Sequence, residues 1–551
     1  MARFPNGMTR GTSGTLPWVD ENDTKDGIPR GMMTGSPQAM PRLLSSPRVR
    51  SPQVGSPQVG SPQVGSLQAG PRPGRLKAAA RRSTLMALAL LTGCSTIDSA
   101  TSGILGSDRP KAGQPGYVAG FLGGVVADEP RAALAGREVL STGGSAADAA
   151  VAVALTLAVT LPSRAGLGGG GACLAYAPGV KSPNGGVPEA VMFTPVAPAS
   201  PPVNADRPAA VPMLARGLYL LNARYGNQRF ETRVAAAEQL ARFGVPVSRA
   251  FAKDLALVSG PLFADPAARA VFSHNGVPLT EGQVMTQPDL GSTLTQIRVA
   301  GVGDFYQGNM ASRIAQASPE IGGPITLQDL HKALPRLTPP LVRPYRNDKI
   351  AFLPPPADGG LAAEAAFDVL ADSPDDVAAA GARSLAVVSR YRAGDITPDA
   401  VLAAHDLPAP ASTVFPASTS FVTMDRNGGA VACTLTLDNL FGTGRIMPGL
   451  GFLAAASPAA VPLPLLAAAL AWNQNIHAFR AAVAGSGQAG AGLAVAMGML
   501  GTLKAHRPVS VPVPDPGRVN IIGCGRYLPG ENSECGWVND PRESGLALGA
   551  N

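Results

Sequence analysis

Four consecutive glycines, at positions 168–171, place the strongest constraint on the fold of this 551-residue chain. Glycine loses more backbone entropy on folding than any other residue, so such a run is not expected in a helix or an ordinary strand. It does permit close backbone approaches that any side chain would block. Because no Lys-Ser or Lys-Thr pair follows, the run does not match a phosphate-binding loop. Residues 146–159, just before it, are almost all apolar, which predicts a helix buried on most sides.

The basic charge of the chain is confined to its first 93 residues, which carry 12 Lys and Arg against 4 Asp and Glu. The other residues carry 33 against 34, so this near-neutral body gives no electrostatic reason to expect nucleic-acid binding. Apolar residues make up 45% of the chain, enough for a sizeable core. No apolar run reaches the roughly 18 residues of a spanning helix, which argues against a multi-pass membrane protein.

The first 75 residues differ from the rest in composition. A Ser-Pro-Gln-Val-Gly unit repeats in tandem from Ser51 to Gly65, and such a low-complexity leader lacks the apolar groups to offset its ordering entropy. We expect residues 1–75 to be disordered. The export signal described next normally begins at a terminus. We therefore also expect that translation begins near Leu76.

Residues 76–94 have the parts of an export signal. Basic residues precede a short apolar run that ends in Leu91-Thr92-Gly93-Cys94. This order resembles the signal of bacterial lipoproteins, which implies cleavage before Cys94 and lipidation of its thiol. Residues 95–115 then form a linker, and Ser95 favours the outer membrane over the inner one. The prediction is an exported lipoprotein on the periplasmic side, with a short buried helix and an accidental cysteine as the alternative.

From residue 116 onward the pattern alternates between strand and helix signals, and a series of ordered motifs resembles the γ-glutamyltransferase family. No single motif is specific, but a dozen occur in the family's order. They include Asp128-Glu129-Pro130, Ser145-Ala146-Ala147-Asp148, the four glycines, Asp304-Phe305-Tyr306, Pro354-Pro355-Pro356, Phe441-Gly442-Thr443-Gly444 and Asp540-Pro541-Arg542. The resemblance implies an α+β fold of the N-terminal-nucleophile hydrolase type, a four-layer αββα sandwich with stacked β-sheets between helical layers.

The resemblance also implies a precursor that cuts itself into a large-subunit-like region, 116–417, and a small-subunit-like region, 418–551, which stay associated. The freed N-terminal residue is the nucleophile, and its own α-amino group is the base. Counting back from Asp425, that residue is Ser418, with Thr419 as the fallback if the segment shifts by one. The family's second threonine corresponds to Thr436. The uncut alternative is a Ser/Thr-rich loop that enters a strand.

The residues that would recognise free glutamate depart from the family pattern. Thr194 stands where the family has a carboxylate-binding arginine, and Asp438 stands in place of a substrate-contacting asparagine, with Asn439 beside it. A bidentate guanidinium is hard to replace in carboxylate recognition. The amine-binding acidic loop is replaced by residues 454–458. The oxyanion-hole positions fall on Gly487, Gln488 and Ala489.

Two functions remain open at this point. One is an amidohydrolase or transferase that acts on a small-molecule amide or γ-glutamyl-like substrate, related to glutathione metabolism but with altered, less polar recognition. The other is a non-catalytic exported lipoprotein that keeps the fold as a scaffold or binding module. Neither hypothesis calls for a cofactor.

Four cysteines remain after Cys94. Cys524 and Cys535 flank a turn-rich loop and are predicted to form a disulfide in an oxidising compartment, with two free thiols as the alternative. Cys173 and Cys433 lie in apolar strand sequence and are expected to be small core residues. No pair has zinc-ligand spacing, so no metal site is predicted.

Overall fold

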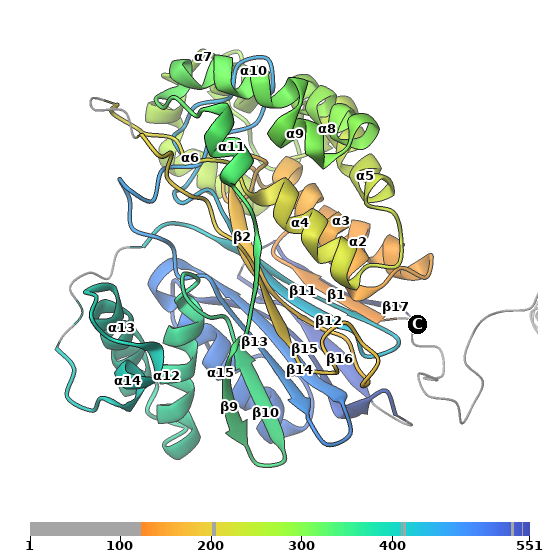
Figure 1. Cartoon of the computed structure of the whole chain (residues 1–551), viewed down its shortest axis with the longest axis vertical. Helices are drawn as coiled ribbons and strands as arrows, with labels where there is room; N and C mark the ends of the chain where they lie inside the picture. Colours follow the sequence, from red (N-terminus) through yellow and green to blue (C-terminus); the bar gives the residue numbers. More distant parts are fainter. Residues whose placement is uncertain are drawn as a thin grey trace, which may run out of the picture. The chain divides into compact units, whose positions relative to one another are not determined.

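The computed structural model describes residues 123–200, 205–408, 410, 415–530, 534–542 and 544–550. The predicted leader, signal and linker, with Cys94, lie outside the described residues. In the described part, the strands form two large antiparallel sheets, and helices cover the outer face of each (Figure 1). No helix in the described ranges is long and apolar enough to cross a membrane.

The first sheet has the strand order β17-β1-β11-β12-β2-β3-β8. Its central hairpin, β11–β12, comes from the small-subunit-like region and lies between strands of the large-subunit-like region. The strands of this sheet are β1 Gly123–Ala127, β2 Gly170–Tyr176, β3 Glu189–Phe193, β8 Arg336–Thr338, β11 Thr419–Asp425, β12 Ala430–Thr436 and β17 Leu546–Ala550.

The second sheet has the order β16-β15-β14-β13-β10-β9 and stacks on the first through contacts of β14 and β15 with β11 and β12. Alternate side chains of both sheets form a shared apolar layer that includes Val422, Ala432 and Ala482. The strands are β9 Leu341–Tyr345, β10 Asp348–Phe352, β13 Ala467–Asn473, β14 Ala478–Ser486, β15 Arg518–Leu528 and β16 Cys535–Val538.

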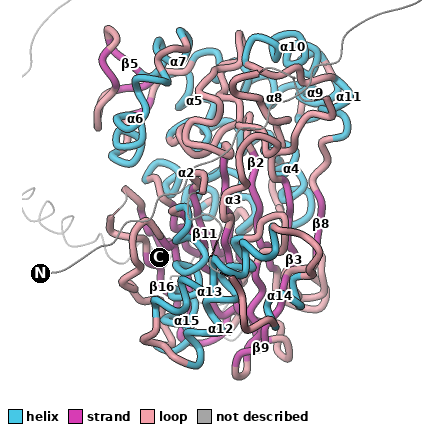
Figure 2. Tube along the Cα trace, turned by 90° about the vertical axis from the view of Figure 1, so that its left-hand side faces the viewer, coloured by secondary structure: helices cyan, strands magenta, loops and turns pink. Residues whose placement is uncertain are grey.

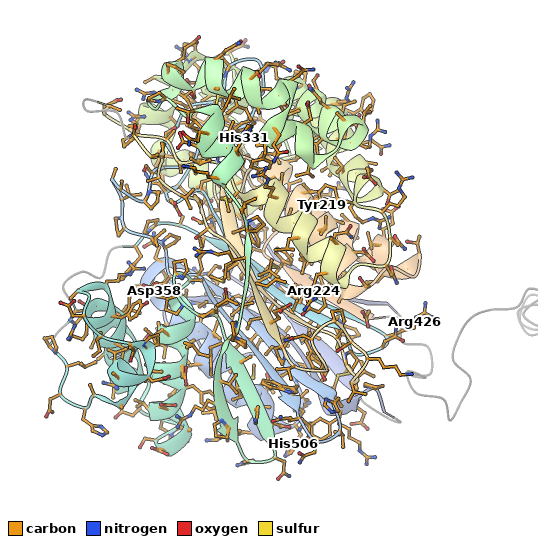
Figure 3. All side chains as sticks on the ribbon, viewed as in Figure 1. Tyr219, Arg224, His331, Asp358, Arg426 and His506 are labelled. Atoms are coloured by element: carbon orange, nitrogen blue, oxygen red, sulfur yellow. A yellow bond between two sulfur atoms is a disulfide. The ribbon has the colours of Figure 1, made fainter. Side chains whose placement is uncertain are left out.

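One helical layer packs against the first sheet. Its central helix α3 begins at a capping box, in which Ser145 and Asp148 bond to each other's backbone N–H groups, and all its residues are buried. This confirms the buried helix predicted for residues 146–159. Arg224 in α4 pairs with Glu189 in β3, 3.1 Å apart (Figure 3). The main helices here are α2 Pro130–Ser141, α3 Ala146–Thr160, α4 Leu214–Tyr225, α5 Phe230–Phe243 and α8 Pro288–Ala300.

Further helices gather beyond one end of the first sheet, at the top of Figures 1 and 2. They are α6 Arg249–Leu262, α7 Pro266–Phe272, α9 Val302–Gln307, α10 Asn309–Ala317, the 3₁₀ helix η1 Ser318–Ile321 and α11 Leu327–Lys332. Two short ribbons complete this end, one pairing β4 Val245–Pro246 with β7 Val284–Met285 and one pairing β5 Ser273–His274 with β6 Val277–Pro278.

The other helical layer packs against the second sheet through α12 and α15, so the order of layers is helix, sheet, sheet, helix. Arg392 in α13 donates two hydrogen bonds to Asp358, which precedes α12, and so ties these two helices together (Figure 3). The helices are α12 Gly359–Asp372, α13 Val377–Arg392, α14 Pro398–Ala403 and α15 Ala491–Ala505, preceded by the 3₁₀ turn η2 Gln488–Gly490.

Close packing against neighbouring backbone explains why glycines occupy these positions. A Cβ on Gly169 would collide with the carbonyl oxygen of Thr436, and one on Gly171 with that of Thr434. A side chain at either position would therefore clash with the backbone of β12. The expectation that glycines cannot belong to an ordinary strand was wrong for Gly170 and Gly171, which begin β2. Close packing in a sheet buried on both faces offsets their entropy cost.

Candidate functional site

Ser418 lies directly before β11 and is 3% exposed. It lines a pocket of about 200 Å³, which we call the nucleophile pocket. The wall comes from loops at the ends of both sheets and from α6. The other residues that line it are Arg164, Asp254, Leu257, Ala417, Leu440, Gly487, Gln488, Pro516 and Arg518. Ser418 therefore reaches a space next to its own peptide bond to Ala417.

Thr436 meets that peptide bond from the neighbouring strand. Because β11 and β12 run antiparallel, with Thr419 opposite Leu435, the last residue of β12 lies beside the segment that enters β11. The Thr436 hydroxyl donates a hydrogen bond of 2.9 Å to the carbonyl oxygen of Ala417. The same hydroxyl accepts the N–H of Asp438 at 2.8 Å, which fixes its direction. The carbonyl beside Ser418 is therefore polarised by an oriented donor.

Thr419 points away from the nucleophile pocket. Its side chain is fully buried, and its hydroxyl donates to the Asp128 carboxylate at 2.9 Å. The N–H of Ser420 donates to the same oxygen at 2.9 Å. This geometry favours Ser418 over Thr419 as the reactive residue.

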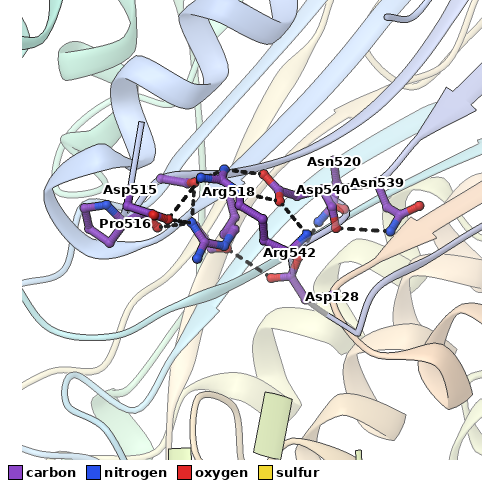
Figure 4. Close-up of polar contacts among 10 residues, drawn as sticks. Asp128, Asp515, Pro516, Arg518, Asn520, Asn539, Asp540 and Arg542 are labelled. Atoms are coloured by element: carbon purple, nitrogen blue, oxygen red, sulfur yellow. Dashed lines mark hydrogen bonds and ion pairs between the residues drawn. The ribbon is translucent and has the colours of Figure 1, made fainter. Parts of the chain in front are cut away.

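Asp128 is the centre of a buried network that fixes the start of β11. Besides Thr419 and Ser420, it accepts the Ser486 hydroxyl at 3.1 Å and the side-chain amide of Asn520 at 2.6 Å (Figure 4). Four donors compensate a carboxylate that is 2% exposed. Sequence reasoning used Asp128 only as part of a family motif. Its position directly after an apolar strand signal was the cue that it caps the end of that strand.

Two arginines line the nucleophile pocket. Arg164 forms a bidentate pair with Asp254, at 2.7 and 2.8 Å, and Asp254 also accepts the Ser163 hydroxyl at 2.6 Å. Arg518 donates to Asp515 at 2.7 Å (Figure 4). Neither arginine was predicted from the sequence. Arg164 and Asp254 are 90 residues apart, and no spacing pattern connects them.

The predicted oxyanion segment borders the same pocket. Gly487 and Gln488 line it, whereas Ala489 does not. Both lining residues have positive φ angles, 96° and 52°, which turns the backbone sharply between β14 and η2. A Cβ at Gly487 would collide with the carbonyl oxygen of Pro516, so only glycine fits there.

The structure does not bring Thr194 and Asp438 to the nucleophile pocket. Thr194 is 8% exposed, next to the end of β3. Asp438 is fully buried, and neither of its carboxyl oxygens has a hydrogen-bond partner among the described residues. Burial raises the pKa of Asp438 well above the usual value of an aspartate. Burial therefore favours the neutral form of Asp438 over the anion.

Asn439 lines a second, larger pocket of about 380 Å³, which we call the apolar pocket. Its walls come from α6, from the loop after β12 and from the segment that replaces the family's acidic loop. The remaining lining residues are Asp206, Arg207, Pro208, Val258, Pro261, Leu262, Leu440, Phe441, Gly442, Thr443, Gly444, Ala456, Ala460 and Val461.

The four cysteines in the described ranges form two disulfides. Cys524 and Cys535 are joined across β15 and β16, as predicted. Cys173 and Cys433, expected to be separate core residues, are also joined. That expectation was wrong because β2 and β12 pair with these two residues directly opposite each other. All residues of β12 are buried, between the helices and the second sheet.

Comparisons with known proteins show which family the chain resembles. The family model of gamma-glutamyltranspeptidase matches residues 132–391, a segment that ends before Ser418. The glutathione hydrolase proenzyme of Escherichia coli strain K12 is 30% identical over 389 residues, 60% of this chain and 65% of that protein. The glutathione hydrolase proenzyme of Bacillus subtilis strain 168 is 32% identical over 253 residues, 43% of each chain. The chain thus spans less than two thirds of the length of these relatives.

A solved structure supports the fold over most of the described chain. The cephalosporin acylase from Bacillus halodurans superposes with a TM-score of 0.64 at 19% identity, covering 81% of this chain and 98% of that one. The four-layer αββα sandwich predicted from the sequence is therefore confirmed as an N-terminal-nucleophile hydrolase fold. The chain is therefore similar to the γ-glutamyltranspeptidase family over residues 132–391, and it shares the fold of this acylase.

Proposed function

We propose that this protein is an amidohydrolase or acyltransferase that activates itself by cutting between Ala417 and Ser418. The observation that carries the proposal is the 2.9 Å hydrogen bond from Thr436 to the Ala417 carbonyl, beside a serine that faces a pocket. A donor aimed at a carbonyl oxygen stabilises the negative charge that develops there when a nucleophile attacks.

Self-cleavage follows from this arrangement in two steps. The Ser418 hydroxyl attacks the Ala417 carbonyl carbon, and the peptide C–N bond breaks, which leaves an ester on the serine oxygen and a free α-amine. Water then hydrolyses the ester, which releases the Ala417 carboxylate and restores the hydroxyl. The new α-amine lies next to that hydroxyl and accepts its proton in later acyl transfer. No histidine is needed for this role.

The two fragments are expected to remain together after the cut. The hairpin β11–β12 belongs to the smaller fragment, yet it pairs on both sides with β1 and β2 of the larger one. The Cys173–Cys433 disulfide also connects the two fragments covalently. Separation would expose the buried faces of both sheets.

Ordinary γ-glutamyl transfer is expected to be weak. Neither Thr194 nor Asp438 lines the pocket of Ser418. Substituting Thr194→Arg would bury a guanidinium without creating the missing amine-binding acid, so it should not restore the activity. An assay of wild type and this variant with γ-glutamyl-4-nitroanilide tests the point. Robust turnover by either protein would contradict altered recognition.

We also propose that the protein is an exported lipoprotein anchored through Cys94, on the outer membrane. The support is the basic, apolar and Leu91-Thr92-Gly93-Cys94 order in the sequence. Cys94→Ala should abolish lipid labelling and release the protein into the soluble fraction. Membrane association that survives this substitution would exclude the anchor.

A reducing denaturing gel of freshly purified protein tests the main proposal. The expected result is a C-terminal fragment of 134 residues, spanning 418–551. A single uncut band would instead support the alternative of a non-catalytic scaffold or binding module.

A further inference from the structure

Phe415 is buried two residues before the peptide bond that is proposed to be cut. Its side chain is 7% exposed and belongs to the apolar cluster between the second sheet and its helical layer. On the other side of the bond, the Thr419 hydroxyl donates to Asp128. The bond between Ala417 and Ser418 therefore lies between two buried side chains that are only four positions apart in the sequence.

Arg392 covers the Phe415 ring. The central carbon of its guanidinium lies 5.2 Å from the ring centre, within the range of a cation–π contact. Arg392 is itself fixed, because it donates two hydrogen bonds to the Asp358 carboxylate, at 2.6 and 2.8 Å, and one to the Leu463 carbonyl oxygen at 2.8 Å. Asp358 is 3% exposed, so water screens this ion pair little. A guanidinium with three bonds to the fold therefore holds the Phe415 ring in place.

A stiff connection joins this ring to the reacting carbonyl. The residue between Phe415 and Ala417 is Pro416, whose ring fixes its own φ at about −65° and restricts the conformation of the residue before it. The Ala417 carbonyl oxygen accepts the Thr436 hydroxyl at 2.9 Å. Attack by Ser418 requires the reacting atoms to lie about 3–3.5 Å apart, and a misplacement of about 1 Å can cost about 10² in rate. The position of the Phe415 ring therefore affects whether the carbonyl meets both hydroxyls.

We propose that Phe415, held by Arg392, is a positioning residue for self-cleavage. It keeps the Ala417 carbonyl on the Thr436 hydroxyl and within reach of Ser418. This inference rests on the proposed function and adds a residue to it. Phe415 does not line the nucleophile pocket, so it acts through the backbone that it holds and takes no part in the chemistry itself.

Substitutions of Phe415 test this role in a time course of newly synthesised protein on a reducing gel. Phe415→Ala should slow the appearance of the C-terminal fragment by about tenfold or more. Phe415→Tyr keeps a ring under the guanidinium and should restore a rate close to that of wild type. If Phe415→Ala does not fold, Phe415→Leu keeps an apolar side chain without the ring and should still slow cleavage by about fivefold.

Two controls separate positioning from general loss of packing. Leu370→Ala also removes a buried side chain from the same apolar cluster, but in α12 and outside the segment to be cut, so it should cleave at the wild-type rate. Arg392→Lys keeps a positive charge beside Asp358 but loses the planar group over the ring. It should slow cleavage of the wild type and have no further effect in Phe415→Ala. Equal slowing in Leu370→Ala, or the same effect of Arg392→Lys with and without the ring, would overturn the proposal.

Melting of the uncut Ser418→Ala protein separates this inference from the function on which it rests. In that background, Phe415→Ala and Arg392→Lys should lower the melting temperature by less together than the sum of their separate effects, because each removes the same contact. An uncut wild type with this coupling would overturn self-cleavage and leave the anchoring of Phe415 supported. A wild type that cuts itself, with Phe415→Ala cleaving at the same rate, would overturn the positioning role alone. Additive effects on melting would overturn the pairing of Phe415 with Arg392 whether or not the wild type is cut.

Discussion

Replacing Thr436 with valine should slow self-cleavage strongly while leaving the fold in place. Valine keeps the shape of threonine but removes the hydroxyl that donates to the Ala417 carbonyl at 2.9 Å. Thr436 is fully buried, so water is not expected to replace that donor. Removing one oxyanion donor from an enzyme site costs about 3–4 kcal/mol, or a factor of about 10²–10³ in rate. We expect a slowing of that order.

The same substitution leaves the Asp438 N–H without its acceptor, which costs about 1–3 kcal/mol of stability. Thr436→Ser separates the two effects, because serine keeps the hydroxyl and should cleave close to the wild-type rate. Thr434→Val is the matched control on the same strand. Thr434 is equally buried, but its hydroxyl has no hydrogen-bond partner among the described residues.

The assay is a time course of newly synthesised protein on a reducing gel, with melting temperatures measured in parallel. Thr436→Val should accumulate the fragment slowly, and Thr434→Val should match wild type. Wild-type speed in Thr436→Val would refute the role of the hydroxyl. Equal slowing in both valine variants would show that packing of β12, not the donor, controls the reaction.

Two further predictions concern covalent linkage and pH. Because Cys173 and Cys433 lie on opposite sides of the cut, the fragments of oxidised protein should run as one band without reductant and as two with it; two bands in both lanes would contradict the bond. Burial raises the pKa of Glu364 to about 7, so its contribution to stability is present below pH 4.5 and is lost as the pH rises through 7. Glu364→Gln should therefore melt higher than wild type at pH 8, by up to about 3 kcal/mol in stability, with little difference at pH 4; no gain at pH 8 would contradict it.

Much of the fold could be predicted because its signals are local or ordered along the chain. The apolar run and the Ser145–Asp148 capping box define α3 within a single stretch of sequence. The order of short motifs indicated the resemblance to the family, and that resemblance implied the four layers. The pairing of Cys173 with Cys433 could not be predicted, since it depends on the register between strands 260 residues apart.

The candidate site was predicted only in part, because it also depends on contacts between segments that are distant in the sequence. Ser418 and Thr436 follow from counting along matched motifs. Arg164, Asp254 and the donors around Asp128 meet only after folding, because they come from distant segments. The expected departure from the family's glutamate-binding residues came from the sequence, whereas the shape of the space beside Ser418 depends on how α6 packs.

Intact mass spectrometry of reduced wild-type and Ser418→Ala protein tests the central claim most directly. The account predicts that wild type yields a fragment that begins at Ser418 and ends at Asn551, and that Ser418→Ala remains one uncut chain. An uncut wild type, a fragment that begins at Thr419, or cleavage that persists in Ser418→Ala would contradict it.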